Sequence, residues 1–193
     1  MIDNLGLLAA RLAVGLGFAS HGSQKAFGWF EGPGLEGAGK FMDTLGFKPG
    51  KQFAGIASAN ELTGGLLIAL GFGGPLGPAM VISTMIVAQN AAHLKNGFFA
   101  QKGGIELGVL YGAAALTFAS SGYGDLSLDH MLGLDKPLRH PVIRTLALAG
   151  AIAAGYVILA QRDFTPPPGT LATPTMTGAR NGEAEINPAP ATG

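Results

Sequence analysis

Five long apolar segments, separated by polar or glycine-rich stretches, dominate the pattern of hydrophobic and polar positions in this chain. They cover residues 4–22, 53–71, 76–93, 104–122 and 141–160. Each has close to the ~17–25 residues that a helix needs to cross the hydrocarbon core of a bilayer. None alternates apolar and polar residues with the period of two that marks a membrane β-strand. The pattern therefore predicts an all-α membrane protein.

The stretches between these segments predict the domain organisation. We expect residues 1–131 to form a membrane domain in which the first four segments make an antiparallel four-helix transmembrane bundle. Residues 132–163 then supply a linker and a fifth transmembrane helix. Residues 164–193 are rich in Pro, Thr, Gly and Ala without periodicity, which predicts a disordered tail. The long loop at residues 27–52 contains several aromatic residues, which is typical of an interfacial or re-entrant loop.

Composition supports a membrane environment and excludes several functions. Hydrophobic residues make up 48% of the chain and charged residues only 12%, whereas a soluble domain carries about 25% charged residues. The net charge of zero gives no electrostatic attraction for nucleic acid. The chain has no cysteine, which excludes disulfides, thiolate metal sites and dithiol exchange. The N-terminus lacks the basic region and cleavage site of a signal peptide, so we expect the first apolar segment to be retained.

Glycine is abundant, with 32 residues. A glycine inside a soluble helix costs about 1 kcal/mol relative to alanine, but small residues let membrane helices approach closely. We expect this use for the small residues within the apolar segments: Gly64, Gly65, Gly108, Gly112, Gly150 and Ala154.

Charged, histidine and amide side chains interrupt the first four apolar segments, and none occurs between residues 146 and 160 of the fifth. Such groups are costly at membrane depth and usually face the interior of a bundle, where they have partners. In an antiparallel bundle most of them would gather toward one membrane face, because the first and third segments end where the second and fourth begin. The sequence thus predicts a polar pocket lined by His21, Lys25, Glu61, Gln89, His93 and Glu106.

Arg11 is predicted to form a structural ion pair with Glu61. The two residues differ in depth by roughly 5 Å at the rise of an α-helix, a gap that a guanidinium side chain can span. Alternatives remain open: Arg11 can extend to the nearer interface, and His21 with Lys25 can form an interfacial collar. Glu106 can serve only to stabilise a helix N-terminus. The spacing of the His and Glu residues is not that of a bundle metal site, so we expect no metal.

Four stretches resemble the successive motifs of the DoxX family of small integral membrane proteins. They are RLAVGLGFASHGSQKAFG at residues 11–28, ANELTGGLLIALGFGGPLGPA at 59–79, NAAHLKNGFFAQKGGIELGVLYGAAAL at 90–116 and SGYGDLSLDH at 121–130. The resemblance implies a four-helix protein in the bacterial cytoplasmic (inner) membrane, and the fifth segment departs from that pattern. Members of the family are linked with quinone-reducing thiosulfate oxidation, oxidative-stress complexes and the maturation of redox proteins.

Three functions follow from this resemblance together with the polar residues. The first is a redox-linked subunit, as a component of a quinone-linked oxidoreductase, whose pocket binds a quinone head group or a small anion and transfers protons. The second is a non-catalytic membrane protein that recruits soluble redox enzymes. The third is a small-solute permease. The lipid bilayer is a partner in each case, redox-enzyme subunits or a second copy of the chain are candidate partners, and the catalytic residues remain unknown. The distribution of lysine and arginine predicts that the first and third loops lie in the cytoplasm.

Overall fold

The computed structural model describes residues 2–165. The disordered tail predicted for residues 164–193 therefore lies almost wholly outside the described residues. Every regular element in the described part is helical. Five long helices correspond to the five apolar segments: α1 (Ile2–Phe27), α3 (Gly50–Leu70), α4 (Leu76–Ala88), α5 (Glu106–Ser121) and α8 (Pro141–Leu159). The prediction of an all-helical chain is confirmed for this part.

Shorter helices fill the connections. They are α2 (Gly34–Thr44), the π-helical turn η1 (Gln89–His93), the 3₁₀ turns η2 (Leu94–Asn96) and η3 (Ala100–Lys102), α6 (Leu128–Met131) and α7 (Asp135–Leu138). Helix α2 was not expected, because its three glycines disfavour a helix. Its burial explains it: Ala38 and Gly39 pack against α3, where a Cβ on Gly39 would lie 2.9 Å from the Cα of Lys51.

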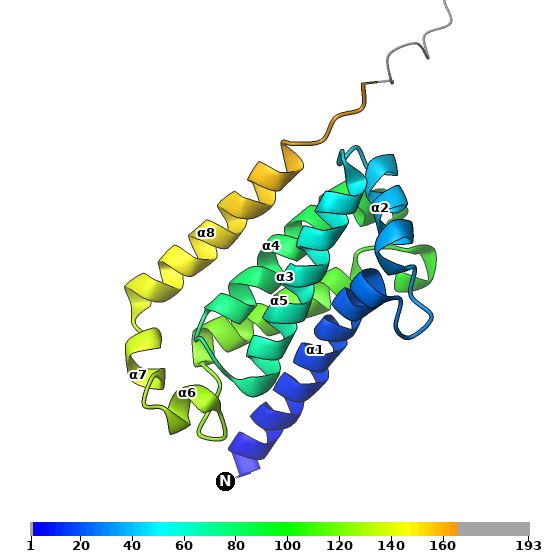
Figure 1. Ribbon diagram of the computed structural model, residues 1–193. Coiled ribbons are helices and arrows are strands. Elements are labelled where there is room, and N and C mark those ends of the chain that lie inside the picture. Colours follow the sequence, from blue (N-terminus) through cyan, green and yellow to red (C-terminus); the bar gives the residue numbers. More distant parts are fainter. Residues whose placement is uncertain (1, 166–193) are drawn as a thin grey trace, which may run out of the picture. The chain divides into compact units, whose positions relative to one another are not determined.

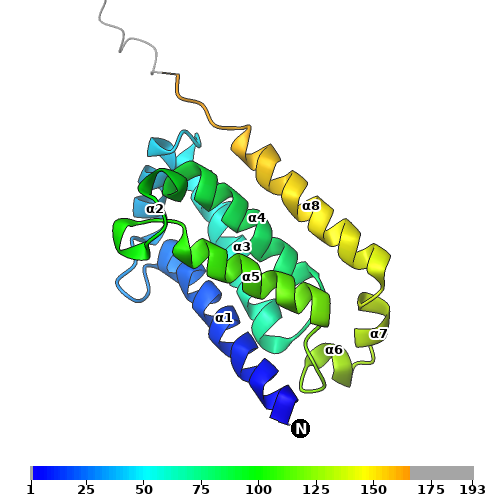
Figure 2. The ribbon, with the colours of Figure 1, turned by 180° about the vertical axis from the view of Figure 1, so that it is seen from behind.

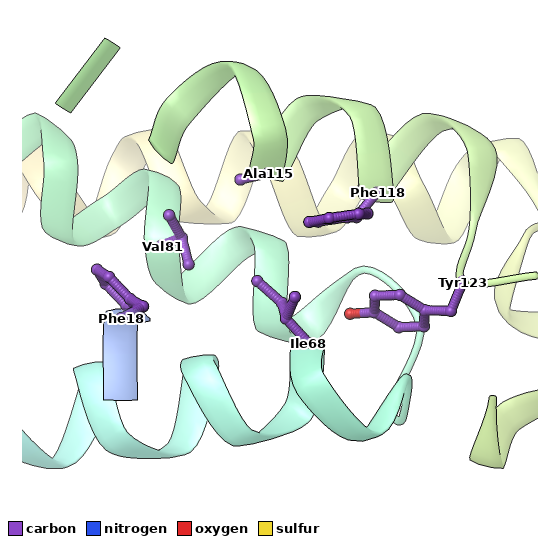
Figure 3. Close-up of a cluster of buried hydrophobic side chains, with 6 residues drawn as sticks. All are labelled: Phe18, Ile68, Val81, Ala115, Phe118 and Tyr123. Atoms are coloured by element: carbon purple, nitrogen blue, oxygen red, sulfur yellow. The ribbon is translucent and has the colours of Figure 1, made fainter. Parts of the chain in front are cut away.

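Helices α1, α3, α4 and α5 lie side by side and share one apolar core (Figures 1 and 2). The core contains Phe18 of α1, Ile68 of α3, Val81 of α4 and Phe118 of α5, and Tyr123 reaches it from the segment after α5 (Figure 3). Helix α8 packs along α4, on the side away from α1 (Figure 1). The short turn at residues 71–75 makes α3 and α4 a helical hairpin.

Glycine brings α1 and α3 into close contact. A Cβ on Gly15 would lie 2.5 Å from the backbone nitrogen of Ala69, and one on Gly22 would lie 2.8 Å from that of Leu62. Gly65 packs in the same way against Ala19 of α1, which confirms its predicted role. Gly112 and Gly150 are different, because a Cβ on either would meet nothing within 4 Å. For these two glycines the prediction of close helix contact within the chain is wrong.

The surface of these helices is apolar while charged residues are buried inside. Leu5, Leu16 and Leu110 each expose more than half of their surface, whereas Arg11 is 1% and Glu61 5% exposed. Among the described residues, α1 from Asn4 to Phe27, α3 and α8 are long and apolar enough to cross a membrane. Helices α4 and α5 have 13 and 16 residues and fall short of that length by themselves. An apolar exterior around buried charges is the distribution expected of a membrane protein.

Candidate functional site

An ion pair between Lys25 and Glu61 joins the end of α1 to the middle of α3. The Lys25 ammonium donates to both carboxylate oxygens of Glu61, at 2.7 and 2.5 Å. The Glu61 side chain is 7% exposed and that of Lys25 is 28% exposed. Lys25 reaches this position because α1 continues as a regular helix to Phe27, five residues beyond the predicted end of the segment. The pair is therefore held between two packed helices.

Arg11 does not form the ion pair with Glu61 that the sequence suggested. Its Nη2 donates to the backbone oxygen of Leu126 at 2.6 Å, and its guanidinium lies 5.9 Å from the centre of the Tyr123 ring. The Nε and Nη1 atoms are buried and have no hydrogen-bond partner among the described residues. The segment after α5 folds back over α1 and supplies these contacts, and Lys25 takes the place predicted for Arg11 at Glu61.

A cavity of about 580 Å³ opens beside the Lys25–Glu61 pair. Its lining residues belong to α1, α2, α3, α4, η1 and α8 and to the loop between α2 and α3. Lys25, Glu61 and His93 give it polar groups, whereas Phe41, Phe47 and Ile158 are representative of its mostly apolar lining. Ligand sites commonly have this volume and a mainly apolar wall with a few convergent polar groups. We call this space the α8 cavity.

The other three predicted pocket residues lie outside the lining of the α8 cavity. The His21 ring packs edge-on to Tyr111 of α5, with ring centres 6.1 Å apart. Gln89 packs tightly against Gly108 of α5, and its buried Oε1 has no hydrogen-bond partner among the described residues. Glu106 accepts a hydrogen bond from the backbone nitrogen of Ala100 at 2.8 Å. Glu106, the first residue of α5, thus holds the loop before that helix.

His93 lies at the end of the π-helical turn and lines the cavity. Its Nδ1 hydrogen-bonds with the backbone oxygen of Gly103 at 2.7 Å, so Nδ1 carries the proton in this contact and Nε2 is left as the acceptor of a neutral ring. The π-helical turn follows α4 directly and changes the direction in which successive side chains point. Single π-turns of this kind occur frequently at functional sites.

Polar residues of α3 and α4 that the predicted pocket did not include also line the cavity. Asn60 donates through Nδ2 to the backbone oxygen of Met80 at 2.9 Å and to Thr84 Oγ1 at 2.7 Å. Ser83 and Thr84 stand on the α4 wall beside it. Asn60 could have been identified as the neighbour of Glu61 in an apolar segment. The sequence does not identify Ser83 and Thr84 as pocket residues, because Ser and Thr in a membrane helix usually hydrogen-bond to the backbone of their own helix.

The aromatic residues of the α1–α2 connection form an exposed group. Phe27, Trp29 and Phe30 are 60, 58 and 66% exposed, and Trp29 packs against both neighbours with ring centres 5.1 and 6.4 Å away. We refer to them as the aromatic loop. They lie outside the lining of the α8 cavity.

Comparison with known proteins adds one finding. A family model described as DoxX matches residues 6–94, which run from α1 to the first residue of η2. No curated protein and no solved structure shows significant similarity to the chain. The matched segment contains Lys25, Glu61 and His93 and ends before α5 and α8.

Proposed function

The chain belongs to the DoxX family through residues 6–94, and from that premise we propose that it is a redox-linked subunit of the bacterial cytoplasmic membrane that binds a quinone. The proposal includes a multi-pass topology in which α1, α3, α4 and α5 form an antiparallel transmembrane bundle and α8 is a fifth span. With η1, helix α4 continues to His93 and gains the length of a span. The apolar exterior of the helices supports this arrangement.

The observation that carries the proposal is the ion pair beside an apolar cavity. A quinone has two carbonyl oxygens that accept hydrogen bonds and an apolar isoprenoid chain. Lys25 Nζ supplies a donor, and the aromatic and aliphatic lining suits the chain. Because Lys25 and Glu61 neutralise each other, the polar end favours an uncharged head group over an anion.

Reduction of a quinone to a quinol requires two electrons and two protons. In the proposed reaction a partner enzyme that oxidises a reduced sulfur compound supplies both electrons, and the head group of the quinone accepts them. His93 lines the cavity, and because its Nδ1–H donates to the carbonyl of Gly103, Nε2 is the ring atom that would pass the two protons, one after the other, from water to the head group. The chain has no cysteine, so it does not pass electrons through a dithiol.

The test measures quinone binding in lipid nanodiscs with decylubiquinone as the probe. We expect the Lys25→Met/Glu61→Leu protein to lose affinity by about tenfold or more, because one charge-assisted hydrogen bond contributes about 1.5–3 kcal/mol. Removing both charges avoids an unpaired buried ion, so the double variant keeps its fold. Lys51→Met serves as the matched control, since Lys51 pairs with the exposed Glu36 on the surface. Equal binding by wild type and the double variant would refute the proposal.

A second candidate function rests on the aromatic loop. Three large exposed aromatic side chains at one helix end suit the recruitment of a soluble redox enzyme, because aromatic residues are enriched at protein interfaces. If recruitment is the function, Trp29→Ala/Phe30→Ala abolishes crosslinking to the partner and leaves decylubiquinone binding unchanged. If the chain is instead a permease, proteoliposomes accumulate solute and Glu61→Gln stops the uptake. A second copy of the chain in the complex is compatible with each function.

A further inference from the structure

Helix α8 forms one wall of the α8 cavity although it lies outside the family match. Ala154, Gly155 and Ile158 line the space together with Asn60 and Glu61 of α3. Both views show α8 running along α4 for most of its length (Figures 1 and 2). Without α8, the cavity would be a groove open to the side on α2, α3 and α4.

The attachment of α8 to α4 is narrow. Ala151 and Gly155 are its buried residues, and Tyr156 and Val157 are 58 and 60% exposed. Gly155 sets the distance between the two helices, because a Cβ there would lie 2.8 Å from Ile86 Cγ2 and 3.2 Å from the backbone oxygen of Ser83. Within the most apolar 18-residue stretch of each helix, 11% of the residues of α8 are buried, against 39% of those of α3. Most of its surface is therefore free to face lipid.

The end of α8 is tied to the loop between α2 and α3. Arg162 Nε donates to the backbone oxygen of Leu45 at 2.7 Å, and its guanidinium lies 5.8 Å from the centre of the Phe47 ring. The backbone nitrogen of Asp163 donates to the oxygen of Gly46 at 2.6 Å. Leu45 and Phe47 also line the cavity. We call these contacts the α8 strap; they join the wall to the rim of the cavity.

We propose that α8 is the lipid-facing wall of a binding site for a molecule with an uncharged hydrogen-bonding head and an apolar chain. This molecule reaches the site from the bilayer past α8, and Gly155 sets the width of the site. The cavity lining is mostly apolar beyond its polar end, so a chain fits and a compact polar solute does not. A phosphate head would need a surplus cation, and Lys25 is already paired. This inference uses the site of the proposed function but does not require that the ligand be a quinone.

The first experiment uses hexadecanol that carries a diazirine on its chain, added to the full-length protein in nanodiscs and mapped by mass spectrometry after irradiation. We expect labels on Ala154 or Ile158 and on the facing residues of α2 and α3. Phosphatidic acid with the same diazirine chain is the charged comparison, and we expect weaker labelling by it. Stronger labelling by phosphatidic acid, or crosslinks from α8 to a second copy or to residues 166–193, would overturn the proposal.

Two alanine variants of α8 form a matched pair. Gly155→Ala places a Cβ against Ile86 and the backbone of Ser83, whereas Gly150→Ala places one where nothing lies within 4 Å. We expect Gly155→Ala to change cavity labelling by the alcohol probe about threefold or more, and Gly150→Ala to leave it unchanged, because only the first moves α8. Ala154→Phe fills the cavity and should abolish the labels. The proposal fails if Gly155→Ala and Gly150→Ala give the same labelling as wild type.

A reversible crosslink tests the route past α8. The chain has no cysteine, so Ile86→Cys/Gly155→Cys introduces a single possible disulfide between α4 and α8. We expect oxidation to slow exchange of the bound alcohol probe by about tenfold and reduction to restore it, since a fixed wall removes the open state. If this variant does not fold, Arg162→Ala, which releases the α8 strap, should accelerate exchange instead. Exchange that is insensitive to these changes would rule out the route.

The outcomes separate the two proposals. If decylubiquinone does not bind but the alcohol probe labels the cavity as described, the quinone function fails and the α8 wall stands. If decylubiquinone binding depends on Lys25 and Glu61 but α8 carries no label and Gly155→Ala has no effect, the quinone function stands and the inference about α8 fails.

Discussion

At the scale of single residues, Lys25 and Glu61 are unequal partners. The carboxylate is 7% exposed and the ammonium 28% exposed, so Glu61 depends on the pair more strongly than Lys25 does. Removing one member of a buried pair leaves an uncompensated charge, which is more damaging than removing both. Because the two side chains differ in exposure, we expect removal of Lys25 and removal of Glu61 to lower the stability by different amounts.

We expect Lys25→Met to destabilise the protein by about 3–5 kcal/mol, because it strands the Glu61 carboxylate without a counter-ion. Glu61→Gln should cost less stability, because the Lys25 ammonium still reaches solvent or head groups. Lys25→Met/Glu61→Leu should recover most of the stability lost in Lys25→Met. Thermal unfolding in a mild detergent measures all three. A Lys25→Met protein as stable as wild type would contradict this account.

The surface pair of Glu36 and Lys51 joins α2 to the start of α3. The hydrogen bond from Lys51, followed by the attraction of its positive charge, lowers the pKa of Glu36 below its ordinary value. A depressed carboxylate pKa stabilises the fold above the unfolded pKa, and that contribution disappears as the pH falls through the folded pKa. We expect Lys51→Met to raise the pKa of Glu36, measured by NMR titration, with little change in stability because the pair is exposed. An unchanged Glu36 pKa would show that the pair does not form.

The sequence identified Glu61 as a buried acid but assigned it the wrong cation. Two features explain this, and only the second is non-local in sequence. Helix α1 extends to Phe27, which puts Lys25 on the same helix as Arg11. The segment after α5 then binds Arg11 through the carbonyl of Leu126, more than a hundred residues away. Helix rise alone does not predict such a contact, because it depends on how a later segment folds back.

At the scale of elements, the segment after α5 holds the other end of the helices together. Asp129 accepts hydrogen bonds from the backbone nitrogens of Gly73 and Gly74, at 2.9 and 2.7 Å, in the turn between α3 and α4. Its own backbone nitrogen donates to Gly71. Asp129 is 3% exposed, so these contacts replace solvent for a buried carboxylate. The motif at residues 121–130 is therefore structural in large part.

Asp129→Ala should lower stability by about 2–4 kcal/mol, because two partly buried backbone donors lose a charged acceptor. Asp129→Asn should also destabilise, since its amide group offers one oxygen where the carboxylate offered two. Asp125→Asn is the control: Asp125 also lies in this segment, but its bond to Asn4 is exposed. Chemical denaturation measures the three variants. Equal stability of the Asp125 and Asp129 variants would argue against a role for Asp129 in holding the turn.

The five long helices followed directly from the runs of apolar residues, and α2 did not. The apolar runs predict helix because lipid leaves an exposed segment no other way to satisfy its backbone. Helix α2 has no such constraint and contains Gly34, Gly37 and Gly39, so local propensity argues against it. Its stability comes from packing on α3, which depends on tertiary contacts.

At the scale of the whole molecule, the proposed five spans fix which loops share a side of the membrane. Helix α2 and the loop containing η3 then lie on one side, and α6 and α7 lie on the other. The lysine and arginine distribution predicts that the first side faces the cytoplasm. Because the chain lacks cysteine, single introduced cysteines report this directly.

We expect Lys40→Cys and Lys102→Cys to react from the cytoplasmic side with a membrane-impermeant maleimide, and Lys136→Cys to react from the opposite side. These three lysines lie in α2, η3 and α7, outside the proposed spans. Labelling of intact cells and of inverted vesicles distinguishes the two sides. Reaction of all three positions from one side would contradict the proposed topology.

The wall formed by α8 has a consequence for how this protein acquires its selectivity. The groups proposed to recognise the head of a ligand lie within residues 6–94, while Gly155 and its neighbours, proposed to meet the chain, lie in a separate helix beyond that segment. Under these proposals, residues 6–94 contain the head-group contacts and part of the apolar lining, such as Phe41 and Phe47, while α8 completes the wall that meets the tail. If the proposals hold, mutations in α8 would change which tails are accepted without altering the head-group contacts, so tail preference could evolve separately from head-group recognition.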